Sequence, residues 1–235
     1  MALKELNATQ KKACLMAIYA FYDEFIRGLP ISCAPGCSVC CTNNVAATTI
    51  EIECLLDSIP LGVRKTVGES LHEALAEPRF IPRYTTNQIA SACLKQKQVP
   101  EEDGRHGKGR CPLLSEDLCM AYEYRPFACR AMLSRTQCAP DSPAYMGGFV
   151  VTINLAIYQI IEHLDRGNPY GNMIDLLAWR LGVQNLAETV PASEPLPGFV
   201  LLPDEKGRFN SFIKRLSKKI VKEMDATLGD ILDCL

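Results

Sequence analysis

The sequence CAPGCSVCC, residues 33–41, concentrates four cysteines in a short stretch and decides how the rest of the chain is interpreted. Turns of two or three residues bring thiolate sulfurs close enough to share one metal, as in zinc knuckles and iron–sulfur loops. Pro35 and Gly36 supply such a turn, because proline fixes φ and glycine permits positive φ. We therefore predict metal ligands among the four cysteines of this stretch, which are Cys33, Cys37, Cys40 and Cys41.

The adjacent pair Cys40–Cys41 is the unusual part of the stretch. Side chains of neighbouring residues usually point apart, so two of them rarely bind one tetrahedral ion together. Either one cysteine is a ligand and the other is a packing residue, or each serves a different metal.

A second group of cysteines, with the spacing C-x7-C-x9-C, follows downstream at Cys111, Cys119 and Cys129. This spacing by itself is weak evidence for a metal site. In combination with the first group it supplies a complementary half, so that two loops each bring about three thiolates to one site. Cys138 is a candidate for a further ligand, and so is His106, although a histidine in such a polar loop is more often solvated.

The combined pattern CxxxCxxCC, then CPLL-x4-C-x2-Y-x2-RP-x2-CR, resembles the YkgJ-type cysteine-cluster family, the zinc- or iron-chelating CxxCxxCC domain. The resemblance covers residues 31–138. It differs from the family pattern in its first cysteine gap, which holds three residues where the family has two. The matched positions are Cys33, Cys37, Cys40, Cys41, Cys111, Cys119, Tyr122, Arg125, Pro126, Cys129 and Arg130.

The resemblance implies zinc or iron as the bound metal, without deciding between them. Glu51 corresponds to a glutamate that the family tends to carry just after the first cluster. Flagellin lysine N-methylases belong to the same wider group, so the resemblance also implies methyl transfer as one candidate activity. That inference is an analogy between families rather than a property of a site.

The residues around the second cysteine group are suited to support a bound metal. Several thiolates around one ion leave excess negative charge, which Arg125 and Arg130 are placed to offset while donating N–H bonds to sulfur. Pro126 would break a helix begun at Met120 and turn the chain back towards the site. Tyr122 is expected to pack over the cluster. The alternative is a surface Arg-Pro turn with exposed arginines.

Composition and charge indicate an ordinary globular protein. The hydrophobic set makes up 48% of the residues and the formal net charge is −2, so neither nucleic acid nor an anionic membrane is indicated as a partner. No run reaches the roughly 18 apolar residues of a membrane span. The first 25 residues contain no uninterrupted apolar segment of a signal peptide, so we expect a cytoplasmic protein, in which structural disulfides are disfavoured.

Helical patterns dominate the chain. Helices are predicted from Asn7 or Thr9 to about Arg27, over 49–59 after Thr48, and over 63–77, 85–98, 143–165, 170–181 and 205–226. Only 43–47 and 199–202 indicate extended chain. We therefore expect a mainly α fold with two irregular cysteine-rich loops joined by a metal site. Residues 1–140 form the cysteine-cluster domain and 141–235 a helical extension packed on it as one structural unit.

Two functions of different classes follow from these patterns. The first is a metal-binding protein whose zinc or iron is structural. The second is an iron–sulfur-dependent enzyme for redox or methyl-transfer chemistry, for which Glu51 and His106 are the available acid–base groups. A disulfide-stabilised or zinc-containing interaction module is a third alternative. The final helix offers a basic face for a protein partner, made of Lys206, Arg208, Lys214, Arg215, Lys218, Lys219 and Lys222.

Overall fold

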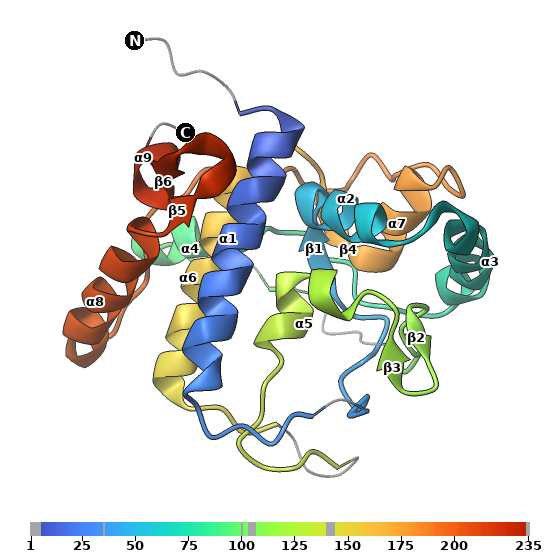
Figure 1. The fold of residues 1–235 in the computed structure, drawn as a ribbon, viewed down its shortest axis with the longest axis horizontal. Helices are drawn as coiled ribbons and strands as arrows, with labels where there is room; N and C mark the ends of the chain where they lie inside the picture. Colours follow the sequence, from blue (N-terminus) through green and yellow to red (C-terminus); the bar gives the residue numbers. More distant parts are fainter. Residues whose placement is uncertain (1–5, 35, 100, 103–106, 140–143, 234–235) are drawn as a thin grey trace.

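The fold is mainly α-helical, as the sequence predicts, and is seen in a computed structural model that describes residues 6–34, 36–99, 101–102, 107–139 and 144–233. Two long helices, α1 and α6, lie side by side through the middle of the molecule (Figure 1). Helices α8 and α9 lie on one side of this pair, and α2, α3 and α7 lie on the other. The α-helices are α1 (Ala8–Arg27), α2 (Thr49–Ser58), α3 (Leu61–Ala76), α4 (Thr86–Leu94), α5 (Phe127–Ala131), α6 (Gly148–Leu164), α7 (Met173–Arg180), α8 (Lys206–Ser217) and α9 (Leu228–Leu232).

The strands of the described residues form three small antiparallel pairs. Strand β1 (Ala46–Thr48) pairs with β4 (Tyr170–Asn172), and this pair lies next to the N-termini of α2 and α7. Strands β2 (Leu114–Ser115) and β3 (Leu118–Cys119) form a tight hairpin within the second cysteine segment. Strands β5 (Ile220–Val221) and β6 (Ala226–Thr227) form a hairpin between α8 and α9.

The buried apolar side chains form two clusters. The first is built mainly from α1, α6, α8 and α9 and includes Phe127 of α5. The second is built from α2, α3 and α7, and Cys111 and Cys119 pack against its edge. Helix α2 contributes to both clusters, with Ile50 in the first and Ile52 in the second. Leu113 and Ala121, from the same segment as Cys111 and Cys119, are buried members of the second cluster, so this core anchors the second cysteine segment.

Several helix boundaries follow the capping signals in the sequence. Asn7 caps α1 in a capping box with Gln10, and Thr85 caps α4 in the same way with Gln88. In these boxes the side chain of the N-cap residue accepts a hydrogen bond from a backbone N–H that the helix itself leaves unpaired.

Other expectations about the ends of elements are wrong. Helix α4 ends at Leu94 rather than 98, and Gln96 just beyond it has a left-handed φ of 51°. The helix predicted over 205–226 is α8, which ends at Ser217. The β5–β6 hairpin, which contains the left-handed residue Asp225, takes the place of its predicted final turns. The segment 199–202 is extended but has no strand partner, since Phe199 and Leu201 pack directly on the first core. No helix among the described residues is long and apolar enough to cross a membrane.

The carboxylate of Glu51 joins three helices. It is only 4% exposed, and its Oε2 accepts hydrogen bonds from the backbone N–H and the hydroxyl of Thr48, both at 2.9 Å, which completes the cap of α2. Its Oε1 accepts from the Tyr19 hydroxyl of α1 at 2.8 Å and from the Phe127 N–H of α5 at 2.7 Å. One carboxylate thus fixes α5, which carries Cys129, against α1 and α2.

Replacing Glu51 by glutamine is expected to destabilise the fold by about 2–4 kcal/mol, because an amide N–H₂ would face buried donors and leave them unpaired. Chemical denaturation followed by circular dichroism measures this loss. The matched control is Glu53→Gln on the same helix, where the carboxylate pairs with Lys12 and Arg180 at the surface and the expected cost is below about 1 kcal/mol. Equal stabilities of the two variants would contradict the role given to Glu51.

Candidate metal centre

Backbone hydrogen bonds bring the two cysteine segments together. The N–H of Cys111 donates to the carbonyl of Cys41 at 3.0 Å, and the N–H of Asn43 donates to the carbonyl of Gly109 at 3.0 Å. Thr42 and Arg110 form an antiparallel bridge between them. A Cβ atom at residue 109 would lie 2.5 Å from the Asn43 side chain, so this close approach needs glycine. Residues 41–43 and 109–111 thus form a short ladder that sets the neighbours Cys41 and Cys111 in register.

The β2–β3 hairpin holds Cys119 near the same place. Cys119 lies opposite Leu114 in the hairpin, and its turn uses two left-handed residues, Glu116 and Asp117. Asp117 accepts a hydrogen bond from the Ser38 hydroxyl at 2.6 Å and forms an ion pair with Arg110 at 2.6 Å. These contacts tie the tip of the hairpin to the first cysteine segment. They lie at the surface, so each is expected to contribute little stability by itself.

Cys129 comes from a third direction, on the short helix α5. Pro126 occupies the N-cap position of this helix, where its missing N–H costs nothing, and Glu51 accepts from the first free N–H. The chain therefore turns at Pro126 as the sequence predicts, and the turn begins a helix of its own.

The thiols from these segments interact electrostatically. The pKa of Cys41 is lowered, chiefly because its sulfur accepts a hydrogen bond from the neighbouring Cys40 thiol, although burial and the sulfurs of Cys111, Cys129 and Cys119 oppose the change. The same hydrogen bond, together with burial, raises the pKa of Cys40. Of the adjacent pair, Cys41 is thus the more readily ionised. Its backbone is also the part of the first segment that pairs with Cys111.

Burial raises the pKa of Cys111 to about 11 and that of Cys129 further still, and the Cys119 sulfur adds to both shifts. These thiols are half-buried and shift one another's pKa values. We call this set the inner thiol group; its members are Cys40, Cys41, Cys111, Cys119 and Cys129.

The remaining predicted ligands gather separately. The pKa of Cys33 is raised by burial and, to a smaller degree, by Cys37, Cys40 and Cys138. Cys37 is exposed and Cys33 and Cys138 are half-buried. We call Cys33, Cys37 and Cys138 the outer thiol group. Cys40 is the residue that interacts with both groups.

No three cysteine, histidine, aspartate or glutamate side chains within the described ranges are placed to hold a metal ion. The inner thiols are neighbours rather than a finished coordination shell. The eleven described cysteines are all free thiols, which gives the disulfide-stabilised alternative no support. A thiolate site commonly closes only when the metal is bound, since uncompensated thiolates repel one another.

The two arginines of the motif occupy different environments. The positive charge of Arg125 lowers the pKa of Cys40, Cys119 and Cys129, opposing the effect of burial, so its guanidinium acts on the inner thiols. It also lies 3.8 Å above the ring of Tyr122, which is half exposed, and it donates to the Tyr122 carbonyl at 2.6 Å. These contacts hold the guanidinium over the second cysteine segment.

Arg130, in contrast, is 1% exposed, and its partners lie elsewhere. It forms an ion pair with Asp23 of α1 at 2.6 Å, donates to the carbonyls of Arg125 and Glu123, and lies 4.2 Å above the Tyr19 ring. These contacts satisfy the hydrogen-bond donors and the charge of the guanidinium without a bond to a sulfur atom. The geometry therefore assigns Arg130 to the packing of α5 on α1.

Glu51 and His106 are the two acid–base candidates of the enzyme hypothesis, and the structure describes only the first of them. Both oxygens of Glu51 are occupied by hydrogen bonds from α1, α2 and α5, so this carboxylate positions α5 and has no free oxygen for a reacting group. His106 lies outside the described residues.

A cavity beside the inner thiols was not predicted from the sequence. It has a volume of about 460 Å³ and is lined by Cys40, by Ala128 and Met132 near α5, and by Leu155 and Tyr158 of α6. Burial raises the pKa of Tyr158, so its phenol stays protonated and is a hydrogen-bond donor. No local signal in the sequence predicts this cavity, because its walls come from segments that are far apart in the chain.

Replacing Arg130 by lysine is expected to destabilise the metal-free protein by about 2–3 kcal/mol, because a lysine cannot make the forked set of bonds to Asp23 and the two carbonyls. Thermal and chemical unfolding measure the change. Arg125→Lys is the matched control and should alter stability by less than about 1 kcal/mol in the metal-free protein. If Arg130→Lys matters only when metal is bound, the structural assignment is wrong.

Comparisons with known proteins found no matching family model, no matching curated protein and no matching solved structure. The resemblance to the YkgJ-type family therefore rests on the cysteine motif alone and stays a prediction.

Proposed function

We propose that this chain is a metal-binding protein in which thiolates of the inner group hold zinc or iron and fasten the two cysteine segments to the helical body. The observation that carries the proposal is the convergence of Cys41, Cys111 and Cys119 through the backbone ladder and the hairpin, with Cys129 brought in by α5. Residues this far apart in the sequence would not share a neighbourhood by local turn formation alone.

The donor set fits a soft or borderline metal. Thiolates favour zinc and iron–sulfur clusters over magnesium or calcium, which prefer oxygen ligands. Four thiolates satisfy either a structural zinc or a [4Fe–4S] cluster, and the inner group contains one more thiol than that. The spare position falls on the Cys40–Cys41 pair, of which Cys41 is the more easily ionised. The positive charge of Arg125 offsets part of the negative charge that such a set of ligands accumulates.

The role that this arrangement favours is structural. The segments 36–45 and 107–125 contain little regular secondary structure. Leu113 and Ala121 anchor the second segment in the second core, whereas the first segment is joined to its surroundings mainly by backbone bonds and surface contacts. Bonds from a metal to ligands on several segments would supply the cohesion that such irregular chain lacks, since metal-binding free energy then contributes to folding free energy.

Serine variants of the inner group test the proposal. In protein purified without oxygen, Cys41→Ser and Cys119→Ser are expected to lower the metal content to less than about half and the melting temperature by about 5–10 °C, because an alcohol is a poor ligand for these metals. Elemental analysis by mass spectrometry and differential scanning calorimetry measure the two effects. Cys93→Ser on α4, outside both thiol groups, should change neither.

The outer group gives a graded comparison. Cys37→Ser should keep most of the metal if one ion is held by the inner group, and an equal loss in Cys37→Ser would place a second metal at Cys33, Cys37 and Cys138. Metal content and melting temperature that stay unchanged in Cys41→Ser and Cys119→Ser together would refute the proposal.

A second candidate function, an iron–sulfur-dependent enzyme, is favoured by one observation, the cavity of about 460 Å³ with Cys40 in its wall. A bound cluster would supply one-electron chemistry next to this space, and the chain itself would supply the apolar walls and the Tyr158 hydroxyl as a donor to a substrate. Its signature is iron with acid-labile sulfide and a brown colour in protein purified without oxygen. A colourless protein with zinc alone would leave only the structural role.

A further inference from the structure

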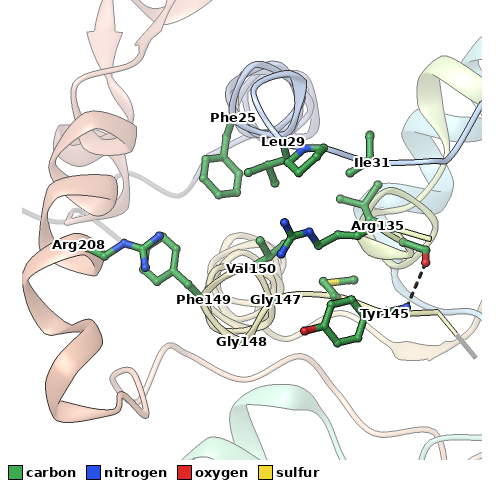
Figure 2. A pocket seen from close by; sticks show the side chains of 14 residues that line it. Phe25, Leu29, Ile31, Arg135, Tyr145, Gly147, Gly148, Phe149, Val150 and Arg208 are labelled. Atoms are coloured by element: carbon green, nitrogen blue, oxygen red, sulfur yellow. Dashed lines mark hydrogen bonds between the residues drawn. The ribbon is translucent and has the colours of Figure 1, made fainter.

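A second cavity lies between α1, α6 and α8, beside the paired residues 32 and 134, and is not used by the proposed metal site. It has a volume of about 350 Å³, at the lower end of the range of roughly 300–1,000 Å³ typical of small-molecule sites. Figure 2 shows its walls, with Phe25, Leu29 and Ile31 on one side and Phe149 and Val150 of α6 on the other. These walls are apolar and would contact the body of a ligand.

Two arginines line the same cavity. Arg208 of α8 lies flat against Phe149, with its guanidinium 3.9 Å from the ring centroid, and Arg135 extends from the opposite side past Val150 (Figure 2). The backbone of Arg135 is fixed by its N–H bond to the Tyr145 carbonyl at 2.9 Å and by the Ser32 hydroxyl, which donates to the Arg135 carbonyl at 2.9 Å. The two cations are thus carried by a helix and by an anchored segment of chain.

These two positive charges are not neutralised within the part of the chain that the structure describes. No ion pair there involves Arg135 or Arg208, and no described residue that lines the cavity is acidic. Arg135 and Arg208 are exposed, and they differ from the more buried arginines Arg79 and Arg130, which have Asp175 and Asp23 as carboxylate partners. Two guanidinium groups in one apolar cavity repel each other, and an anion placed between them would relieve that repulsion.

The start of α6 contributes free backbone N–H groups to the cavity, and the Glu205 carboxylate near Gly148 offsets part of their positive potential. The N-cap of α6 is Gly147, which has no side chain to accept from the first backbone N–H groups, and both Gly147 and Gly148 line the cavity. This feature supports the arginine pair and does not replace it, because most helices have free N–H groups at this end.

We propose that this cavity binds a small organic anion with an apolar or aromatic body, its acidic group held by Arg135 and Arg208 and its body packed on Phe25, Phe149 and Val150. The paired cations select the charge and the apolar walls select the body. None of the described residues that line the cavity is a cysteine, so the proposal does not depend on which metal the protein binds.

The probe for the test is 3-phenylpropionate, and its neutral analogue 3-phenylpropanamide has the same body and shape. Isothermal titration calorimetry at low ionic strength should show the acid binding at least about tenfold more tightly than the amide, because a charge-assisted bond to a guanidinium is lost in the amide. Raising the salt concentration should reduce this difference.

Arginine variants assign the binding to the cavity. Arg208→Gln and Arg135→Gln are each expected to weaken binding of the acid about fivefold or more and to leave the amide almost unchanged. Arg215→Gln is the matched control, because Arg215 is also an exposed arginine of α8 that lies over a phenylalanine, Phe21, but outside the cavity. It should bind the acid as the unmodified protein does.

Backbone NMR provides a second readout, in which the acid should shift the amide signals of Gly147, Gly148 and Phe149. Equal affinity for acid and amide, unchanged binding in both cavity variants, or no binding of the acid at millimolar concentration would each overturn the proposal. Both arginines are exposed at the surface, so the variants are expected to fold, and their melting temperatures verify this.

Discussion

The buried carboxylate of Glu51 is the interaction on which the remainder of the structure depends. It accepts from Thr48, Tyr19 and Phe127 and thereby joins the cap of α2, the side of α1 and the first turn of α5. A buried anion is costly unless its lone pairs are satisfied, so the three elements must reach it together. The same bond that begins α5 sets the position of Cys129 two residues later. The packing of α1, α2 and α5 and the position of Cys129 therefore depend on the same carboxylate.

The helices of this chain could be predicted largely because their ends carry local signals. Asn7 and Thr85 mark their helix starts by side-chain chemistry that acts over three residues, and such chemistry is visible in sequence. The end of α8 could not be found in this way. There the choice between a longer helix and a hairpin depends on Val221 and Leu228 packing on the first core, which is a property of the tertiary structure.

In the candidate site, too, local sequence predicts some features and tertiary contacts determine the others. Cysteine spacing predicted seven ligands, which stay a prediction, and spacing could not separate the inner group from the outer one. That separation results from the backbone ladder between 41–43 and 109–111, a long-range pairing without a sequence signal apart from the glycine at 109. Likewise, Arg125 and Arg130 are equivalent in the motif, and the tertiary contacts of Arg130 with Asp23 and Tyr19 of α1 distinguish them. The two cavities have walls from several elements and were invisible for the same reason.

The ladder between residues 41–43 and 109–111 also has a consequence for the timing of assembly. It closes a loop that contains α2, α3 and α4, and closing so long a loop costs more chain entropy than its few hydrogen bonds return. The loop must therefore be shortened first by the packing of α2 and α3 against α7 in the second core. Cysteines from the two segments meet only afterwards, so a nascent chain presents scattered thiols until its helices have docked. On the proposed function, capture of a metal would then be a late event, and a polypeptide stalled before helix docking would present only half of the proposed ligands.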